Sequence, residues 1–201
     1  MSARRAPATA DRKGAILDAA IVVIARRGVR GLRVEQVAAE AGVATSLLYY
    51  YFDNRNGLVR ATLDHANERA ATTLAPDRAS GREAVEHKLL AELDDDANVR
   101  DTSVVWNEVL ASAVFEADLR DQLREATRTW VVLVADAIRE GLADGSIPAG
   151  TDPDRCAGRL TSLVDGLSSR WLAGIVTREE ARALLSEAIA AELGRADTQR
   201  A

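Results

Sequence analysis

The chain has 201 residues, 47% of them hydrophobic, which is enough for one small module and one larger domain. Its net charge of −5 would argue against a nucleic-acid partner if it were uniform, but residues 1–60 carry ten basic and five acidic side chains, a balance of +5, against −10 for the remainder. No apolar run approaches the ~18 residues that span a membrane, and the basic N-terminus lacks the apolar segment of a signal peptide, so we expect a cytoplasmic protein without a membrane partner.

The N-terminal region begins with a basic arm and a helix. We expect residues 1–10 to be disordered. From Lys13 to Arg26, apolar residues recur at the spacing of one helix face, and Gly28 follows them. This pattern predicts a helix that ends at Gly28 and braces the two helices after it.

Residues 31–58 predict a helix-turn-helix. The first helix spans roughly residues 34–40, where apolar side chains form one stripe. Gly42 ends this helix, because glycine tolerates the left-handed conformation of a helix stop or tight turn. The second helix spans about residues 45–51.

The second helix contains three consecutive tyrosines, residues 49–51. Leu48 and Phe52 stack on one side of this helix, whereas Ser46 and Tyr50 point to the other. The outward side suits the major groove of DNA, and tyrosine hydroxyls can reach phosphate oxygens or base edges there. The alternative is that the tyrosines belong to the core, but Leu48 and Phe52 already fill the inner face.

This segment resembles the TetR family of bacterial regulators. The shared pattern is a glycine, a V-x-x-V-A core, an A-G-V turn, an L-Y-x-x-F helix, and a small polar residue, a basic residue and a leucine that open the next helix. Here these are Gly31, Val34, Val37, Ala38, Ala41, Gly42, Val43, Leu48, Tyr49, Phe52, Asn54, Arg55 and Leu58. The chain departs from the usual pattern at Ala44 and Leu47, where the family often has polar residues.

The resemblance implies an operator DNA partner. Arg55 stands where the family usually has a lysine, and a phosphate contact survives that exchange. Leu47 replaces a small polar residue that often touches a phosphate, so a contact with a thymine methyl group is an alternative there. The candidate DNA-binding residues are Arg33, Thr45, Ser46, Leu47, Tyr49, Tyr50, Tyr51 and Arg55.

The remainder of the chain predicts one helix after another and no β-strand. Asn54 or Asp53 caps a long helix that runs to about Leu74 before Pro76. Further helices are expected near residues 81–94, 102–115, 117–142, 153–173 and 178–193. The predicted fold is therefore all-α with about nine helices: a helix-turn-helix domain over residues 11–55, a regulatory and dimerisation domain over residues 56–194, and a disordered tail over residues 195–201.

Two of the later helices suggest a homodimer. In the segment 154–174, bulky residues form one stripe and small residues form another, and small side chains let helices approach closely. Such a helix pair is the usual dimer interface in TetR-like proteins, although both stripes could instead pack within one protomer. The candidate interface residues are Gly158, Ser162, Gly166, Ser169, Leu185 and Ile189. This half also resembles the branch that includes the choline-responsive repressor of betaine synthesis, through Asp165, Gly166 and Leu167 followed by Arg170 and Trp171.

The family resemblance implies an effector pocket among the fourth to eighth helices. The candidate lining residues are Trp106, Asn107, Glu108, Leu110, Thr127, Trp130 and Trp171, with Val109, Phe115 and Val134 as further apolar candidates. A pocket needs a few polar groups among apolar ones, which Asn107 and Glu108 would supply. Alternatively the aromatic residues are ordinary core, and Asn107 and Glu108 are exposed. No sequence feature names the effector.

Other chemistry finds little support in the sequence. Cys156 is the single cysteine and reads as a small buried hydrophobe, and His65 and His87 have no Cys or His neighbours at ligand spacing, so neither a metal nor a cofactor is expected. No combination of nucleophile, base and orienting group can be assembled, which argues against an enzyme. We expect a homodimeric repressor that binds a palindromic operator and leaves it on binding a small, mainly apolar effector. The alternative is a helical carrier protein with a vestigial DNA module.

Overall fold

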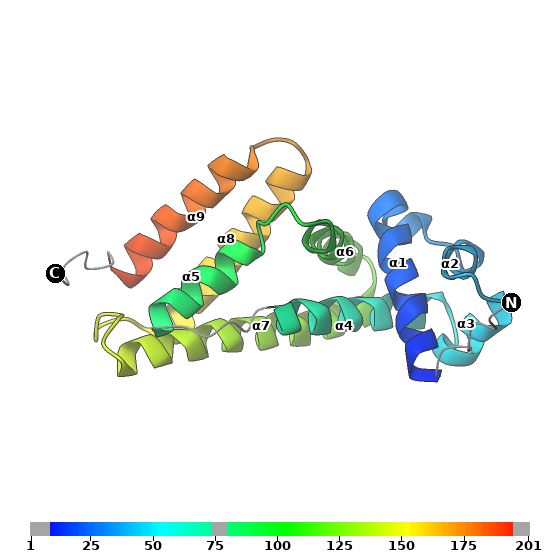
Figure 1. Cartoon of the computed structure of the whole chain (residues 1–201), viewed down its shortest axis with the longest axis horizontal. Coiled ribbons are helices and arrows are strands. Elements are labelled where there is room, and N and C mark those ends of the chain that lie inside the picture. The colour runs from blue at the N-terminus through cyan, green and yellow to red at the C-terminus, as the bar shows by residue number, and fades with distance from the viewer. Residues whose placement is uncertain (1–8, 74–79, 195–201) are drawn as a thin grey trace, which may run out of the picture.

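The computed structural model describes residues 9–73 and 80–194, and within this part of the chain it contains nine α-helices and no strand (Figure 1). The helices are α1 (Thr9–Gly31), α2 (Val34–Ala41), α3 (Thr45–Phe52), α4 (Arg55–Thr73), α5 (Gly81–Ala91), α6 (Ala97–Ala113), α7 (Ala117–Ala143), α8 (Pro153–Leu172) and α9 (Arg178–Leu193). The all-α prediction is confirmed. None of these helices is long and apolar enough to cross a membrane.

The predicted ends of the chain fall largely outside the described residues. The expected tail, residues 195–201, lies outside them, as do residues 1–8 of the expected arm. Thr9 and Ala10 already belong to α1, so the arm was predicted two residues too long. The predicted end of α4 at Leu74 is also outside the described residues.

The helix ends follow local side-chain chemistry. Asn54 Oδ1 accepts the Gly57 N–H at 2.9 Å and caps α4, as predicted. Asp152 accepts the Arg155 N–H at 3.1 Å before α8, and Thr177 begins α9 with a capping box. The start of α6 was predicted five residues too late, because the cap is Asp96, whose Oδ1 accepts the N–H groups of Asn98 and Val99.

The start of α6 is not the only revised boundary. Gly28 has φ 70° and ψ 167°, so α1 breaks there, but a final turn continues to Gly31 instead of ending at Gly28 as predicted. The end of α5 was predicted at residue 94, and the helix stops at Ala91.

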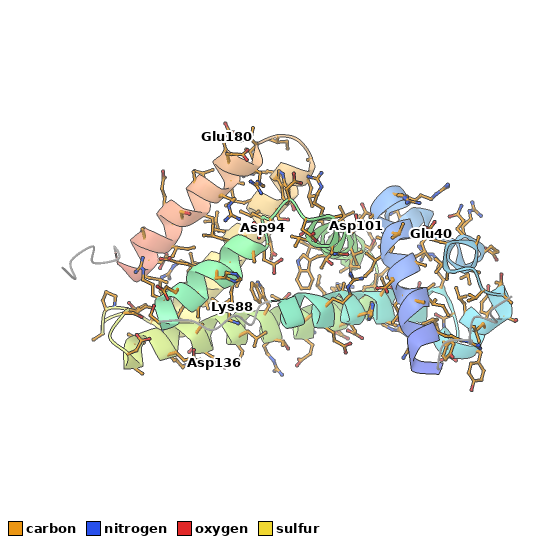
Figure 2. The ribbon with its side chains drawn as sticks, in the orientation of Figure 1. Glu40, Lys88, Asp94, Asp101, Asp136 and Glu180 are labelled. Carbon is orange, nitrogen blue, oxygen red and sulfur yellow. The ribbon has the colours of Figure 1, made fainter. Side chains whose placement is uncertain are left out.

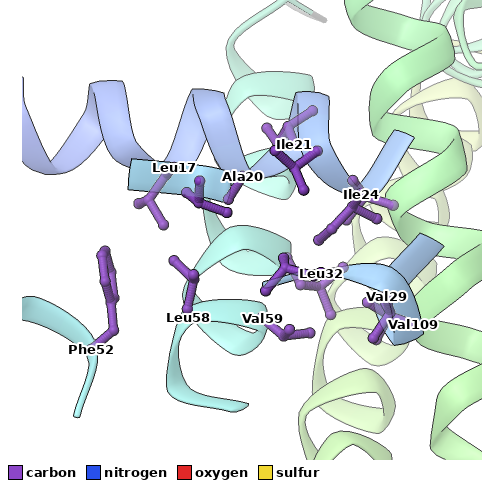
Figure 3. Close-up of a cluster of buried hydrophobic side chains, with 14 of the residues drawn as sticks. Leu17, Ala20, Ile21, Ile24, Val29, Leu32, Phe52, Leu58, Val59 and Val109 are labelled. Carbon is purple, nitrogen blue, oxygen red and sulfur yellow. The ribbon is translucent and has the colours of Figure 1, made fainter. Parts of the chain in front are cut away.

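Two hydrophobic clusters hold the helices together. The first joins α1–α4 with α6 and the start of α7, and Figure 3 shows its inner side chains, including Ile24, Leu58 and Val109. The second joins α5, most of α7, α8 and α9 around residues such as Leu89, Ile138 and Leu167. By the expected boundary at residue 55, α6 belongs to the regulatory domain, yet it contributes to the first cluster. The DNA-binding helices therefore share one hydrophobic core with part of the regulatory domain.

Candidate DNA-binding surface and effector cavity

The recognition helix α3 has one buried and one exposed face. Leu48 and Phe52 are buried in the first cluster, as predicted. Tyr49 and Tyr50 are 49% and 77% exposed, and Ser46 is exposed beside them. The tyrosine pair therefore projects from a helix whose opposite side is anchored, which excludes the core alternative for both residues.

The outer face of α3 is narrower than the sequence predicted. Leu47 and Tyr51 are half-buried and pack against the first cluster, and Thr45 is also only half-exposed. The ring of Tyr51 lies 5.2 Å from that of Tyr50, edge to face. Leu47 and Tyr51 therefore act mainly as supports for the outward residues, because an eight-residue helix resting on a core leaves only one face free.

Arg55 makes contacts that the sequence did not indicate. Its Nε donates to the carbonyl oxygen of Leu32 at 3.1 Å, and its Nη2 donates to the carbonyl oxygen of Val29. These bonds tie the start of α4 to the final turn of α1 and to the residue after it. Arg55 therefore has a structural role that the sequence did not indicate. Its phosphate contact stays a prediction, since Arg55 also lines the open depression next to α3.

Other arginines surround a broad open depression next to α3. Arg27, Arg30 and Arg33 are exposed there, and Tyr49 lies at its edge. The depression has a volume of about 790 Å³. Of these arginines, only Arg33 was singled out from the sequence, although the positive balance of residues 1–60 pointed to such a cluster. Three exposed guanidinium groups beside a recognition helix suit the phosphate backbone of DNA.

A second cavity, of about 440 Å³, lies within the regulatory helices. Three of the predicted residues line it: Trp106, Asn107 and Trp130. The lining comes from α4, α6, α7 and α8 and from the residue that ends α5, namely Asp64, Asn67, Glu68, Glu92, Thr102, Ser103, Trp106, Asn107, Gln122, Glu125, Ala126, Thr129, Trp130, Leu133, Val164, Asp165 and Ser168. The cavity is thus formed by segments that are far apart in the sequence.

Several predicted pocket residues lie elsewhere. Trp171 is buried in the second cluster, and the Arg100 guanidinium lies 5.0 Å above its ring. Leu110 is 42% exposed, Thr127 does not line the cavity, and Glu108 contacts α1 instead. Of the further apolar candidates, Val109 and Val134 are core residues and Phe115 is exposed. Apolar periodicity does not distinguish a core face from a cavity face, which explains these errors.

Five carboxylates line the cavity, and the sequence prediction included none of them. They are Asp64, Glu68, Glu92, Glu125 and Asp165, and no lysine or arginine is among the lining residues. By contrast, Asp136 and Glu180 project from the outer sides of α7 and α9 (Figure 2). In the sequence, the only indication of these cavity carboxylates was the spacing of Asp64 and Glu68, which lie four residues apart on one face of a helix.

Two of these carboxylates are shielded from water. Burial raises the pKa of Glu92 to about 7, and the charge of Asp165 adds to the rise. Burial also raises the pKa of Asp165 to about 6, and the nearby indole N–H of Trp106 offsets part of that rise. Both side chains therefore lack a positive partner, and a cation in the cavity would stabilise their charged forms.

Comparisons with known proteins agree with this architecture. Residues 16–62 match the family described as bacterial regulatory proteins of the tetR family, and residues 81–194 match the BetI-type transcriptional repressor C-terminal family. The chain belongs to the TetR family. The resemblance seen in the helix-turn-helix and in the segment around Asp165 is confirmed for both halves.

Individual relatives cover almost the whole regulator. A TetR-family protein of known structure from Rhodococcus sp. is 42% identical, with a TM-score of 0.87 over 92% of this chain and 100% of its own. A transcriptional regulator from Saccharomonospora viridis, solved in complex with choline, is 26% identical, with a TM-score of 0.74 over 90% and 95% of the two chains. The regulator BetI of Cronobacter sakazakii is 27% identical over 90% of this chain and 91% of its own.

In this TetR-family regulator, α6 connects the cavity to the DNA-binding helices. Trp106 and Asn107 of α6 line the cavity, and the adjacent Glu108 accepts the Val29 N–H at 2.8 Å through Oε2. A Cβ atom at Gly28 would lie only 2.6 Å from the same oxygen. Glu108 thus contacts α1 directly at its break, close to the backbone carbonyl groups that Arg55 binds.

The exposed side of α8 carries small residues in its middle, between the exposed arginines 155, 159 and 170. Ser162 and Gly166 are exposed and Gly158 is half-exposed, and nothing described lies within 4 Å of where a Cβ atom would stand at either glycine. Ser169 is half-buried, and its hydroxyl donates to Asn107 Oδ1. Ser169 therefore contributes to the packing between α6 and α8 within one protomer, which corrects its assignment to the dimer interface.

The outward face of α9 also differs from the prediction. Leu185 and Ile189 are fully or almost fully buried in the second cluster, so neither can reach a partner. Leu184, one position earlier, is 47% exposed. A helix turns about 100° per residue, so a shift of one position exchanges an inner for an outer residue.

Proposed function

We propose that this regulator is a homodimeric repressor that binds a palindromic operator through α3 and leaves it when a small organic cation enters the cavity. The observation that carries the effector class is a cavity with five carboxylates, two tryptophans and no basic side chain. Aromatic faces and carboxylates are the groups that attract organic cations. The carboxylates add a positive charge to the mainly apolar effector that the sequence suggested.

The comparisons support this proposal. The matched families are regulators, and one relative was solved with choline, a quaternary ammonium cation. We therefore propose no catalytic activity, and a site of action in the cytoplasm, where a bacterial operator lies. We also propose the domain division at about residue 55, with α3 and the exposed arginines on DNA and with α8 between protomers.

One experiment tests the proposed function directly. Bound duplexes would be selected from a random pool, and the selected sequence would be titrated with protein by fluorescence anisotropy, with and without choline. We expect a sequence with twofold symmetry and a weaker complex in the presence of choline. Selection of no preferred sequence would contradict the repressor function and favour the carrier protein.

The outward tyrosine predicts a change in sequence preference. Tyr50→Ala should reduce discrimination in each half-site by about 1 to 3 kcal/mol per specific contact, because the side chain is the most exposed aromatic group of α3. Binding to unrelated duplex should change little. Anisotropy titrations on the operator and on a scrambled duplex measure both quantities. Loss of the thermal transition would instead show that Tyr50 supports the fold.

The contact between Glu108 and Val29 predicts a loss of communication. Glu108→Ala removes the acceptor of the Val29 N–H. Cation binding in the cavity should then lower operator affinity by a smaller factor than in the unchanged protein. We expect the ratio of operator affinities without and with choline to fall toward one, from a coupling that is typically about 1 to 3 kcal/mol. Glu108→Gln is the matched control, because its amide oxygen can still accept that N–H. An alanine variant with an undiminished ratio would exclude Glu108 from the coupling.

The shielded carboxylate predicts a pH-dependent stability difference. The pKa of Glu92 is raised to about 7 in the folded protein, so the folded state holds a proton that the unfolded state has already lost above the ordinary pKa of about 4.5. The Glu92 contribution to stability therefore falls as pH rises from about 4.5 to about 7. Urea unfolding at pH 5 and pH 8 should show that Glu92→Gln gains stability relative to the unchanged protein at the higher pH. A difference that is independent of pH would contradict the burial of this group.

A further inference from the structure

The carboxylates of the cavity form two groups on different walls. Asp64 and Glu68 belong to α4, which packs mainly against α1, α3, α6 and α7. Glu92 follows the last residue of α5, and Asp165 belongs to α8. These two helices pack against α7, α9 and each other, and α8 also packs against α6. In Figure 1, α4 and α5 also occupy successive positions along the molecule. The two groups therefore face the cavity from different sides.

The two groups differ in their access to solvent. Asp64 and Glu68 are exposed. Glu92 and Asp165 are half-buried. Glu125 adds a further exposed carboxylate near the first group, where it also pairs with Arg128 at 3.1 Å.

No other residue that lines the cavity is charged. Two of these residues are the aromatic Trp106 and Trp130, and the rest are apolar, such as Val164, or neutral polar. The stretch of α7 that lines it extends from Gln122 to Leu133, about 16 Å at 1.5 Å per residue. A volume of about 440 Å³ corresponds to roughly 15 water molecules at ~30 Å³ each, so a ligand of more than a few heavy atoms fits.

The inner end contains a buried polar group without a partner. Ser168 lines the cavity, is only 5% exposed, and its hydroxyl oxygen makes no hydrogen bond to any described residue. Buried polar groups are normally satisfied, so this hydroxyl group indicates a place for a polar group of a ligand near Asp165, one helical turn earlier on α8.

We propose that the effector is an organic dication, with one positive group held by Glu92 and Asp165 and a second held by Asp64 and Glu68, joined by an apolar linker along the tryptophans. This inference rests on the proposed function and makes the effector class more specific. A ligand with one charge would neutralise only one of the two groups. A diamine or a longer polyamine has the charge at both ends that this cavity matches.

Calorimetric titration without DNA separates the contribution of each end. The probes are hexane-1,6-diamine, hexan-1-amine and choline, all titrated at the same salt concentration. The amino groups of the first two probes are protonated near neutral pH. The diamine and the monoamine share a linker and differ by one charge. We expect the diamine to bind at least tenfold more tightly than either monocation.

Two variants locate the two charges. Glu68→Gln should weaken the diamine toward the affinity of hexan-1-amine and leave the monoamine nearly unchanged. Asp165→Asn should weaken both. The matched control is Glu187→Gln, which neutralises an exposed carboxylate of α9 outside the cavity lining and should alter neither. Thermal unfolding confirms that each variant is folded, and the Glu68 variant, at an exposed position, decides the matter if Asp165→Asn does not fold.

The outcomes distinguish this inference from the function on which it rests. Equal affinities for the diamine and the monocations would overturn the dication and leave a cation-responsive repressor intact. Diamine binding that is insensitive to Glu68→Gln would overturn the two-ended arrangement. Absence of binding by all three probes, from a protein that still binds its selected operator, would overturn the cationic effector class but not the repressor.

Discussion

A Gly166→Leu protein should be largely monomeric and should lose about 100-fold or more of its affinity for an operator with two half-sites. Gly166 is exposed next to Ser162 on the outer side of α8, and no described atom of another element lies within 4 Å of where its Cβ would stand. A leucine there fits within one protomer but would separate two α8 helices that meet on this face. Because a dimer binds both half-sites at once, its loss removes a gain that is commonly about 100-fold to 10,000-fold.

Analytical ultracentrifugation and an operator titration measure the two effects together. Gly166→Ala is the matched control, because a methyl group meets open space in the protomer and adds little bulk to a helix pair. We expect that variant to remain dimeric. Affinity for unrelated DNA should change much less than operator affinity. The substitution in α8 does not alter α3 or the arginines beside it, which in our proposal make the general contacts with DNA. A Gly166→Leu protein that stays dimeric would place the interface elsewhere.

Gly81→Ala should lower the free energy of unfolding by about 3 kcal/mol, which corresponds to a decrease of roughly 10 °C in the melting temperature. A Cβ atom at residue 81 would lie 2.1 Å from the backbone nitrogen of Gly141 and 2.5 Å from its Cα. Both contacts are with backbone, which cannot turn aside as a side chain would. The start of α5 would therefore move away from the end of α7, and the Gly81 N–H would weaken its 2.7 Å bond to Asp144.

Gly14→Ala provides the control for the intrinsic preference of alanine. Gly14 lies in α1, and nothing described is within 4 Å of its Cβ position, so alanine should stabilise the helix by up to about 1 kcal/mol. Thermal unfolding of both variants gives the comparison. A Gly81→Ala protein as stable as the unchanged one would show that α5 and α7 can separate without cost. In that case the position of Glu92 at the end of α5 would also be less restricted than the packing indicates.

Local sequence signals predicted most of the fold. The starts of α8 and α9, predicted near residues 153 and 178, were correct, because the caps Asp152 and Thr177 act within one turn of their own helices. The inner side of α3 was also correct, because Leu48 and Phe52 lie one helical turn apart on an apolar face. The start of α6 was missed because residues up to 94 were predicted to belong to α5, whereas Asp96 caps α6.

Roles that depend on distant partners were predicted less well. Arg55 and Glu108 were predicted to contact DNA and the effector, yet both bind the backbone at the end of α1 or directly after it. Their partners lie more than 20 and about 80 residues away in the sequence, so neither pairing has a local pattern. On α9, the choice between Leu184 and Leu185 as the outward residue depended on how the helix rotates against its neighbours.

The sequence by itself determined the helix-turn-helix, the family and the order of helices, because periodicity, caps and turn residues act over a few neighbouring positions. Only the tertiary structure decided the character of the cavity. Asp64, Glu92 and Asp165 come from three separate helices, and each alone is indistinguishable from a solvated surface acid. Packing places them around one cavity and partly buries Glu92 and Asp165. This burial raises the pKa values of these two carboxyl groups, and a cation in the cavity would stabilise their charged forms.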